Sequence, residues 1–212
     1  MRCALHTMIA CLVLSGFVRA QDVEPIPAEE AHKWAGRLLA DIDKANTSPV
    51  KIAADANLAN GIHVPDRLGV MVIPQKDLKE TEELAAQFKS DCGAPLAYLL
   101  TYAVRPLVAD NVAKAEQLRI LKVIDDQGQS HEICVIPLAV KQVADDDYRL
   151  QGYGADNKLV IDAKFSQISE SGSGSVTIGV KDADEVTLQG TVEVTVFGKY
   201  RAEFRAQHTE GN

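Results

Sequence analysis

The chain lacks the short motifs that mark several common enzyme classes. It contains no Gly-x-Ser-x-Gly turn, no glycine-rich loop between a strand and a helix, and no Cys-x-x-Cys pair. Serine hydrolases of the α/β class, phosphate-binding folds and zinc or redox cysteine sites each depend on one of these patterns. The sequence therefore argues against nucleotide binding, and it predicts no cofactor and no metal.

Basic residues are also too few to form a positively charged binding surface. The chain holds 22 Lys and Arg residues against 30 Asp and Glu residues, a formal net charge of −8. Nucleic-acid phosphates and anionic lipid surfaces both require clustered Lys and Arg. Neither is an expected partner, and the excess acid is typical of a domain that stays soluble after export.

The longest apolar run lies at the N-terminus. Residues 8–18, MIACLVLSGFV, follow the positive charge of Arg2 and end shortly before the small residue Ala20. This order predicts a secretory signal that is cleaved after Ala20, because the run is shorter than the roughly 20 residues of a membrane-spanning helix. Lipid attachment at Cys11 is the alternative. No later segment is expected to span a membrane.

The predicted mature chain, residues 21–212, is long enough for one domain with a sizeable core. Loss of Arg2 and Arg19 with the signal, residues 1–20, leaves 20 basic residues against 30 acidic ones, a net charge of −10. We expect a single exported domain in the periplasm or outside the cell. Residues 110–117 are its best internal boundary.

Two cysteines, Cys92 and Cys134, remain after removal of the signal. In an oxidising compartment they can form a disulfide, which would contribute roughly 3–4 kcal/mol on the chain-entropy model. Two buried free thiols are the other interpretation, and the sequence leaves both open.

Residues 27–45, PAEEAHKWAGRLLADIDKA, have the spacing of an amphipathic helix. Their apolar positions recur every three or four residues and form one continuous face, and Pro27 suits the first turn. The sequence therefore predicts a helix that packs on a core.

A second helix is predicted from Asp77 to about Asp91. Asp77 and Glu80 have the spacing of a capping box, and Gly93 is a stop signal. Strand-like runs precede and follow this helix, over 68–74 and 94–108. Strand, helix and strand in this order permit a βαβ unit.

Beyond residue 115 the chain is predicted to be all β. Hairpin turns are expected at Asp125–Gln129 and at Gly154–Asn157, and a third hairpin follows the polar connection Ser169–Ser175. The sequence therefore predicts an α+β fold. Its core is a mostly antiparallel sheet or β-sandwich of about eight to ten strands, with two amphipathic helices in the N-terminal half.

Residues 186–206 alternate most regularly, with apolar residues or glycine at every even position. One straight strand of this length would span about 69 Å, more than the roughly 42 Å diameter of such a domain. A three-residue turn at Phe197–Lys199 would pair Val196 with Tyr200 and keep the two faces separate. A strongly bent single strand is the alternative. The even residues expected on the core are Val192, Val194, Val196, Tyr200 and Phe204.

The most site-like stretch is residues 59–76, ANGIHVPDRLGVMVIPQK, in which His63 and Asp66 lie three positions apart. A histidine oriented by an aspartate can act as a general base, and the two side chains can also bind a metal ion. Gly61 and Pro65 lie beside this pair, however, and such residues favour a solvated turn. His63 and Asp66 are therefore weak catalytic candidates.

Residues 131–134, His-Glu-Ile-Cys, contain three types of metal ligand. On a strand, however, His131 faces away from Glu132 and Cys134, so the three cannot converge on one ion. The acidic clusters elsewhere fall in predicted turns, and none has the spacing of a calcium-binding loop.

Taken together, these patterns favour a non-catalytic binding or structural module of the periplasm or cell exterior, with an unidentified protein or small ligand as its partner. The alternative is a hydrolase-type enzyme that uses His63 and Asp66. The surroundings of His63 distinguish the two, because catalysis needs further titratable groups in a concave pocket.

Overall fold

The computed structural model describes residues 23–64, 68–124, 128–169, 174–184 and 187–209. The predicted signal peptide and Asp66 lie outside these described residues. Within them, no helix combines the length and the apolar character that crossing a membrane requires.

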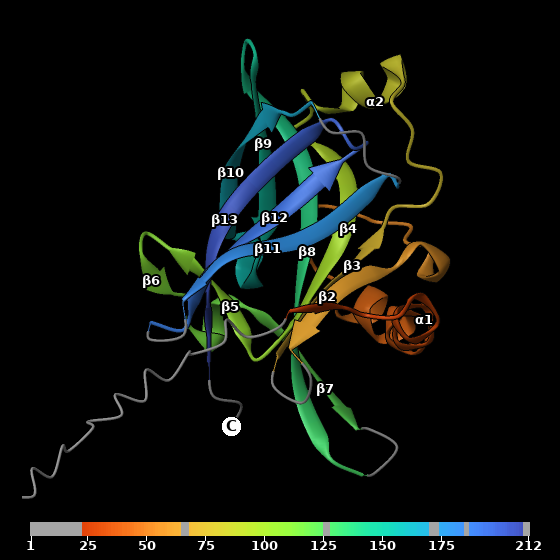
Figure 1. Ribbon diagram of the computed structural model, residues 1–212. Coiled ribbons are helices and arrows are strands. Elements are labelled where there is room, and N and C mark those ends of the chain that lie inside the picture. The colour runs from red at the N-terminus through yellow and green to blue at the C-terminus, as the bar shows by residue number, and fades with distance from the viewer. Residues whose placement is uncertain (1–22, 65–67, 125–127, 170–173, 185–186, 210–212) are drawn as a thin grey trace, which may run out of the picture.

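Antiparallel strands dominate the fold and belong to one curled sheet (Figure 1). Two α-helices accompany this sheet, so the chain is an α+β protein, as predicted. The helices are α1 (Ala28–Ala45) and α2 (Glu82–Gln87). The strands are β1 (Glu24–Pro25), β2 (Asn60–Val64), β3 (Leu68–Pro74), β4 (Ala94–Tyr102), β5 (Val104–Val108), β6 (Asn111–Val112), β7 (Arg119–Ile124), β8 (Ser130–Ala144), β9 (Asp147–Tyr153), β10 (Leu159–Gln167), β11 (Val176–Asp184), β12 (Gln189–Val196) and β13 (Tyr200–His208).

The sheet has 13 strands, more than the sequence predicts. One reason is Ala103, whose φ of 52° breaks the predicted strand over 94–108 into β4 and β5. Another is that β1 and β6 have two residues each, too few to show an alternating pattern. The βαβ unit does not form, because β3 and β4 are antiparallel neighbours.

The sheet curls so far that β11 approaches β2, although the two strands are far apart in the chain (Figure 1). A side chain rather than a strand pairing bridges these two strands. The amide nitrogen of Asn60 donates to the carbonyl oxygen of Val176 at 2.9 Å, and its amide oxygen accepts from the backbone N–H of Ile178 at 3.2 Å. Asn60 therefore closes the sheet by taking the place of a backbone partner.

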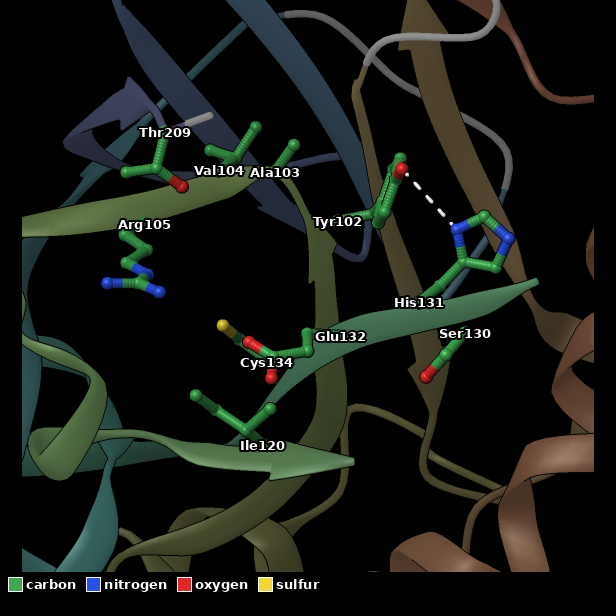
Figure 2. A pocket seen from close by; sticks show the side chains of 10 residues that line it. All are labelled: Tyr102, Ala103, Val104, Arg105, Ile120, Ser130, His131, Glu132, Cys134 and Thr209. Atoms are coloured by element: carbon green, nitrogen blue, oxygen red, sulfur yellow. Dashed lines mark hydrogen bonds between the residues drawn. The ribbon is translucent and has the colours of Figure 1, made fainter. Parts of the chain in front are cut away.

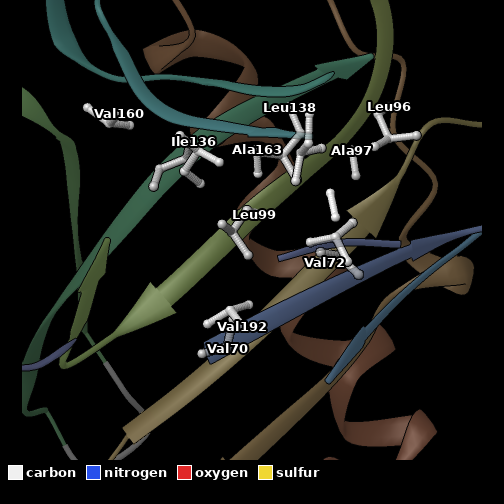
Figure 3. Packing of buried hydrophobic residues seen from close by; sticks show 14 of the residues in the cluster. Val70, Val72, Leu96, Ala97, Leu99, Ile136, Leu138, Val160, Ala163 and Val192 are labelled. Atoms are coloured by element: carbon white, nitrogen blue, oxygen red, sulfur yellow. The ribbon is translucent and has the colours of Figure 1, made fainter. Parts of the chain in front are cut away.

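Apolar side chains fill the inside of the curled sheet. Figure 3 shows residues of this cluster converging from strands on different sides of the sheet. The members are aliphatic and of moderate size, which allows layers from opposite walls to interdigitate. They include Val70, Val72, Leu96, Leu99, Ile136, Leu138, Leu150, Ile161, Val192 and Val194.

The first helix covers part of the outer face and forms a second core there. α1 begins one residue after the start of the predicted range, and Ala31, Ala35, Leu38 and Ile42 are buried against the sheet. Met71, Ile73, Tyr98 and Leu100 belong to the same cluster. The helical periodicity in the sequence therefore identifies the buried face of α1 correctly.

The second helix starts later and is shorter than predicted. The hydroxyl of Thr81 caps it by accepting from the backbone N–H of Leu84 at 3.2 Å. The predicted cap, Asp77, has φ 55° and lies in a turn instead. Leu78 and Phe88 on either side of α2 pack against the inner core, so this segment is held by its flanks rather than by the helix.

The C-terminal hairpin forms as predicted, with Val196 opposite Tyr200 and Val194 opposite Ala202. Phe197 and Gly198 both have positive φ, 53° and 64°, as the two central residues of a type I′ turn do. The other predicted hairpins, β7 with β8, β9 with β10 and β11 with β12, also pair antiparallel.

The two faces of this hairpin differ less than the sequence suggests. Val192, Val194 and Val196 are buried, as predicted, but Tyr200 and Phe204 are only half-buried. The face predicted to meet water carries ion pairs: Glu193 contacts Lys181 at 3.3 Å and Arg201 at 3.1 Å. These contacts shield part of that face from solvent.

Candidate functional site

An open groove of about 660 Å³ lies on the outer face of the sheet beside α1. Met71, Leu100 and Ile133 contribute apolar surface from the sheet, and Trp34 and Leu38 contribute it from α1. This volume lies within the roughly 300–1,000 Å³ of typical small-molecule pockets. The groove is larger than a second hollow of about 100 Å³ that shares two of its residues, Tyr102 and His131.

The periodicities of helix and strand place these side chains together. Glu30, Trp34 and Leu38 are spaced by four residues, so they lie along one side of α1. Gly69 and Met71 are two residues apart in β3, so both face outward. A Cβ atom at Gly69 would meet nothing closer than the Cβ atom of His63, at 3.8 Å, so the missing side chain is part of the hollow.

His63 lines this groove and lies in a strand, not in a solvated turn. It is half-buried in β2, opposite Gly69 on one side and Glu24 on the other. His63 itself is therefore not part of a turn, whereas Pro65 and Asp66 lie outside the described residues. Gly61 serves packing rather than a turn: a Cβ atom there would come within 2.8 Å of the Ile26 side chain. Glycine is required for close packing.

A second histidine lies in the same groove. The ring of His131 packs edge-on against that of Tyr102, with centroids 5.4 Å apart, and its Nδ1 is 3.4 Å from the tyrosine hydroxyl. Glu30 also lines the groove. His63, His131, Tyr102 and Glu30 therefore supply polar groups around a mostly apolar hollow.

His131 and Tyr102 also line a smaller pocket of about 100 Å³ (Figure 2). Cys134, Glu132 and Arg105 contribute charged or reactive groups to it. The His131 ring points away from the other two side chains of its strand in Figure 2, as the alternation of a strand predicts. Glu132 and Cys134 thus share one face.

Burial raises the pKa of the Cys134 thiol. Hydrogen-bonding groups of Thr101 and Arg105 oppose this shift without cancelling it. Because the thiolate is the nucleophilic form, Cys134 is held as a thiol and is a poor nucleophile at neutral pH.

The disulfide between Cys92 and Cys134 is not present, and both cysteines are free thiols. Cys92 packs against the outer core, whereas Cys134 belongs to the inner one. The register explains the separation: Ala94, two residues after Cys92, pairs with Val140, six positions along β8 from Cys134. Six strand residues span about 20 Å, far beyond the reach of a disulfide.

The described residues contain no group of three or more His, Cys, Asp or Glu side chains arranged to hold a metal ion. Asp66, the predicted partner of His63, lies outside the described residues. Two site residues that sequence reasoning missed are Trp34 and Arg105. Trp34 looks like any residue of a core stripe, and the only signal for Arg105 is its position as a lone charge in an apolar run.

Comparisons of the chain with protein-family models, with curated proteins and with solved structures found no match. The chemistry of the site is therefore inferred from the geometry of its own residues.

Proposed function

We propose that the chain is an exported, non-catalytic binding module that holds a small apolar molecule in the groove beside α1. The groove itself carries this proposal, since it offers about 660 Å³ of mostly apolar surface with few polar groups. Small-ligand sites have this composition, because apolar walls supply affinity and a few polar groups set the orientation. Export is supported by the predicted signal peptide.

Trp34 provides a direct readout of binding. It is the only tryptophan of the chain and lines the groove, so an apolar ligand that enters should change its fluorescence. We expect a panel of aromatic and long-chain apolar compounds to contain saturating ligands.

A matched pair of glycine variants tests whether the groove is the site. Gly69→Val should fill the hollow and weaken ligand binding by at least about tenfold, a loss of about 1.4 kcal/mol. Gly179→Val makes the same change on β11, where a Cβ atom would meet only the Glu193 side chain, at 3.5 Å. Equal affinity for both variants would show that the ligand binds elsewhere.

Export has its own test. The mature protein should begin at Gln21, because the small residue Ala20 ends the signal. N-terminal sequencing of protein from the envelope or culture fluid checks this, and retention of residues 1–20 would contradict it.

A second candidate function is a hydrolase-type enzyme that uses His63 and Asp66, and the position of His63 in the groove favours it. In that case His63→Ala should abolish turnover of a chromogenic ester by the mature chain. For a binding module, the wild-type protein should show no turnover, and His63→Ala should keep its fold and most of its ligand affinity.

A further inference from the structure

The smaller pocket carries opposite charges on two of its walls. Arg105 comes from β5 and Glu132 from β8, and the two side chains face the same open space in Figure 2. Cys134 lies beside Glu132 on β8 with its sulfur toward this space. Both charged residues are half-buried, so their charges are less screened than those of exposed residues.

Neither charge is neutralised by a close partner inside the pocket. Within the described part of the chain, Arg105 makes no ion pair with a carboxylate, and Glu132 contacts only the exposed Lys122, at 3.8 Å. Arg105 and Glu132 do not contact each other either. A cation and an anion that share a small pocket without touching leave room for a ligand between them.

Hydrogen bonds to main-chain carbonyl groups hold the walls of this pocket in place. Ala103, with φ 52°, turns the chain from β4 into β5. The backbone N–H of Thr209 donates to the carbonyl oxygen of Ala103 at 2.9 Å. The hydroxyl of Thr101 donates to the carbonyl oxygen of Val104 at 2.6 Å. Such contacts position Arg105 before any ligand arrives.

We infer that this pocket binds a small zwitterion, with its carboxylate at Arg105 and its ammonium group at Glu132. The size of the hollow, about 100 Å³, equals about three water molecules at roughly 30 Å³ each. A short amino acid such as glycine fits this space. A simple anion would be repelled by Glu132, and a simple cation by Arg105.

The thiol of Cys134 reports directly on occupancy. It is one of only two cysteines in the predicted mature chain, and Cys92, on the outer core, serves as an internal reference. We expect glycine to slow modification of Cys134 by the small neutral reagent methyl methanethiosulfonate in a saturable manner. Modification of Cys92, followed by mass spectrometry in the same sample, should keep its rate.

Acetate and methylamine, which each carry one of the two charges, should protect Cys134 at least about tenfold less well than glycine, as expected for loss of a charge-assisted hydrogen bond. γ-Aminobutyrate, with the same charges set further apart, should also protect poorly. Equal protection by acetate would identify a simple anion site and overturn the inference. No protection by glycine at about 100 mM, a concentration at which even weak binding would be seen, would overturn it as well.

Charge-neutral variants locate the ligand. Arg105→Gln and Glu132→Gln should each raise the glycine concentration needed for half-protection by about tenfold or more. Lys158→Gln removes an exposed charge that does not line the pocket and should leave protection nearly unchanged. Equal effects of all three variants would indicate a general charge effect and contradict the inference. Gly69→Val, which blocks the groove, should not alter glycine protection.

Discussion

Tyr98 links the C-terminal end of α1 to the sheet by polar contacts. Its hydroxyl accepts from the side-chain amide of Asn46 at 3.0 Å and donates to a carboxylate oxygen of Asp43 at 3.0 Å. The ring is fully buried in the outer core. Burial raises the pKa of Tyr98 to about 12, and the hydrogen bond from Asn46 opposes the shift.

This shift predicts a loss of stability at high pH. Tyrosine in the unfolded chain has a pKa near 10, so the unfolded state releases its proton first. The contribution of the protonated Tyr98 hydroxyl to the free energy of unfolding is therefore fully present below pH 10, and it is lost as the pH rises from about 10 through about 12. The total loss is about 3 kcal/mol, and urea unfolding at a series of pH values measures it.

Tyr98→Phe is the matching variant, because it removes the titrating group and keeps the ring. It should be less stable than the wild type at pH 8, since Asn46 and Asp43 lose their partner, and its stability should fall less steeply above pH 10. Some slope should remain from Tyr153, whose pKa burial also raises. An unchanged slope would mean that Tyr98 does not cause it.

Among the elements, the hairpin of β12 and β13 shows most directly how sequence alternation becomes packing. Val194 is fully buried inside the sheet, whereas its neighbour Thr195 is half-buried on the outer side. Thr195 lies opposite Arg201 in β13. Two residues that are adjacent in the chain therefore lie on opposite faces of the sheet and have different surroundings.

Adjacent aspartate substitutions test this difference. Val194→Asp should cost several kcal/mol, because it places a charge without a partner in the core. Thr195→Asp should change the free energy of unfolding by roughly half a kcal/mol or less, since its carboxylate reaches solvent and the nearby Arg201. Denaturant unfolding of the two variants side by side gives the comparison. Equal losses would show that something covers the outer face as well.

For the molecule as a whole, a side chain of β2 bridges the seam at which the sheet closes. Asn60 of β2 holds β11 across a separation of 116 residues from Val176 and 118 residues from Ile178. Backbone pairing across this seam is not present between β2 and β11 among the described strands. The stability of the seam should therefore be more sensitive to Asn60 than to other surface asparagines.

Asn60→Ala should lower stability by about 1–3 kcal/mol, because two backbone groups lose their partner. The amide of Ile178 should also exchange its hydrogen faster, which nuclear magnetic resonance or mass spectrometry detects. Asn57→Ala is the control, since the Asn57 side chain is exposed and bonds only to the nearby Asp55. If Ile178 exchanges at the same rate in both variants, the seam is held by other contacts.

Much of the fold could be predicted because it follows from short-range periodicity. The apolar stripe of α1, the turn at Phe197–Lys199 and the opposite orientation of His131 and Glu132 all depend on residues within a few positions of one another. The start of the second helix is predicted wrongly for the same reason: Asp77 matches a local capping pattern but has φ 55° in the turn after β3, and α2 begins at Glu82.

The sequence by itself determined the α+β class, the antiparallel pairing of the later strands and the burial of Val192, Val194 and Val196, because alternation and helical spacing are properties of neighbouring residues. Only the tertiary structure decided that Gly69 leaves a hollow beside His63, that Arg105 faces Glu132, and that Cys92 and Cys134 lie in different cores. These relations depend on strand order, on the bend at Ala103 and on closure through Asn60. They join residues far apart in the chain, where local propensity carries no information about which segments meet.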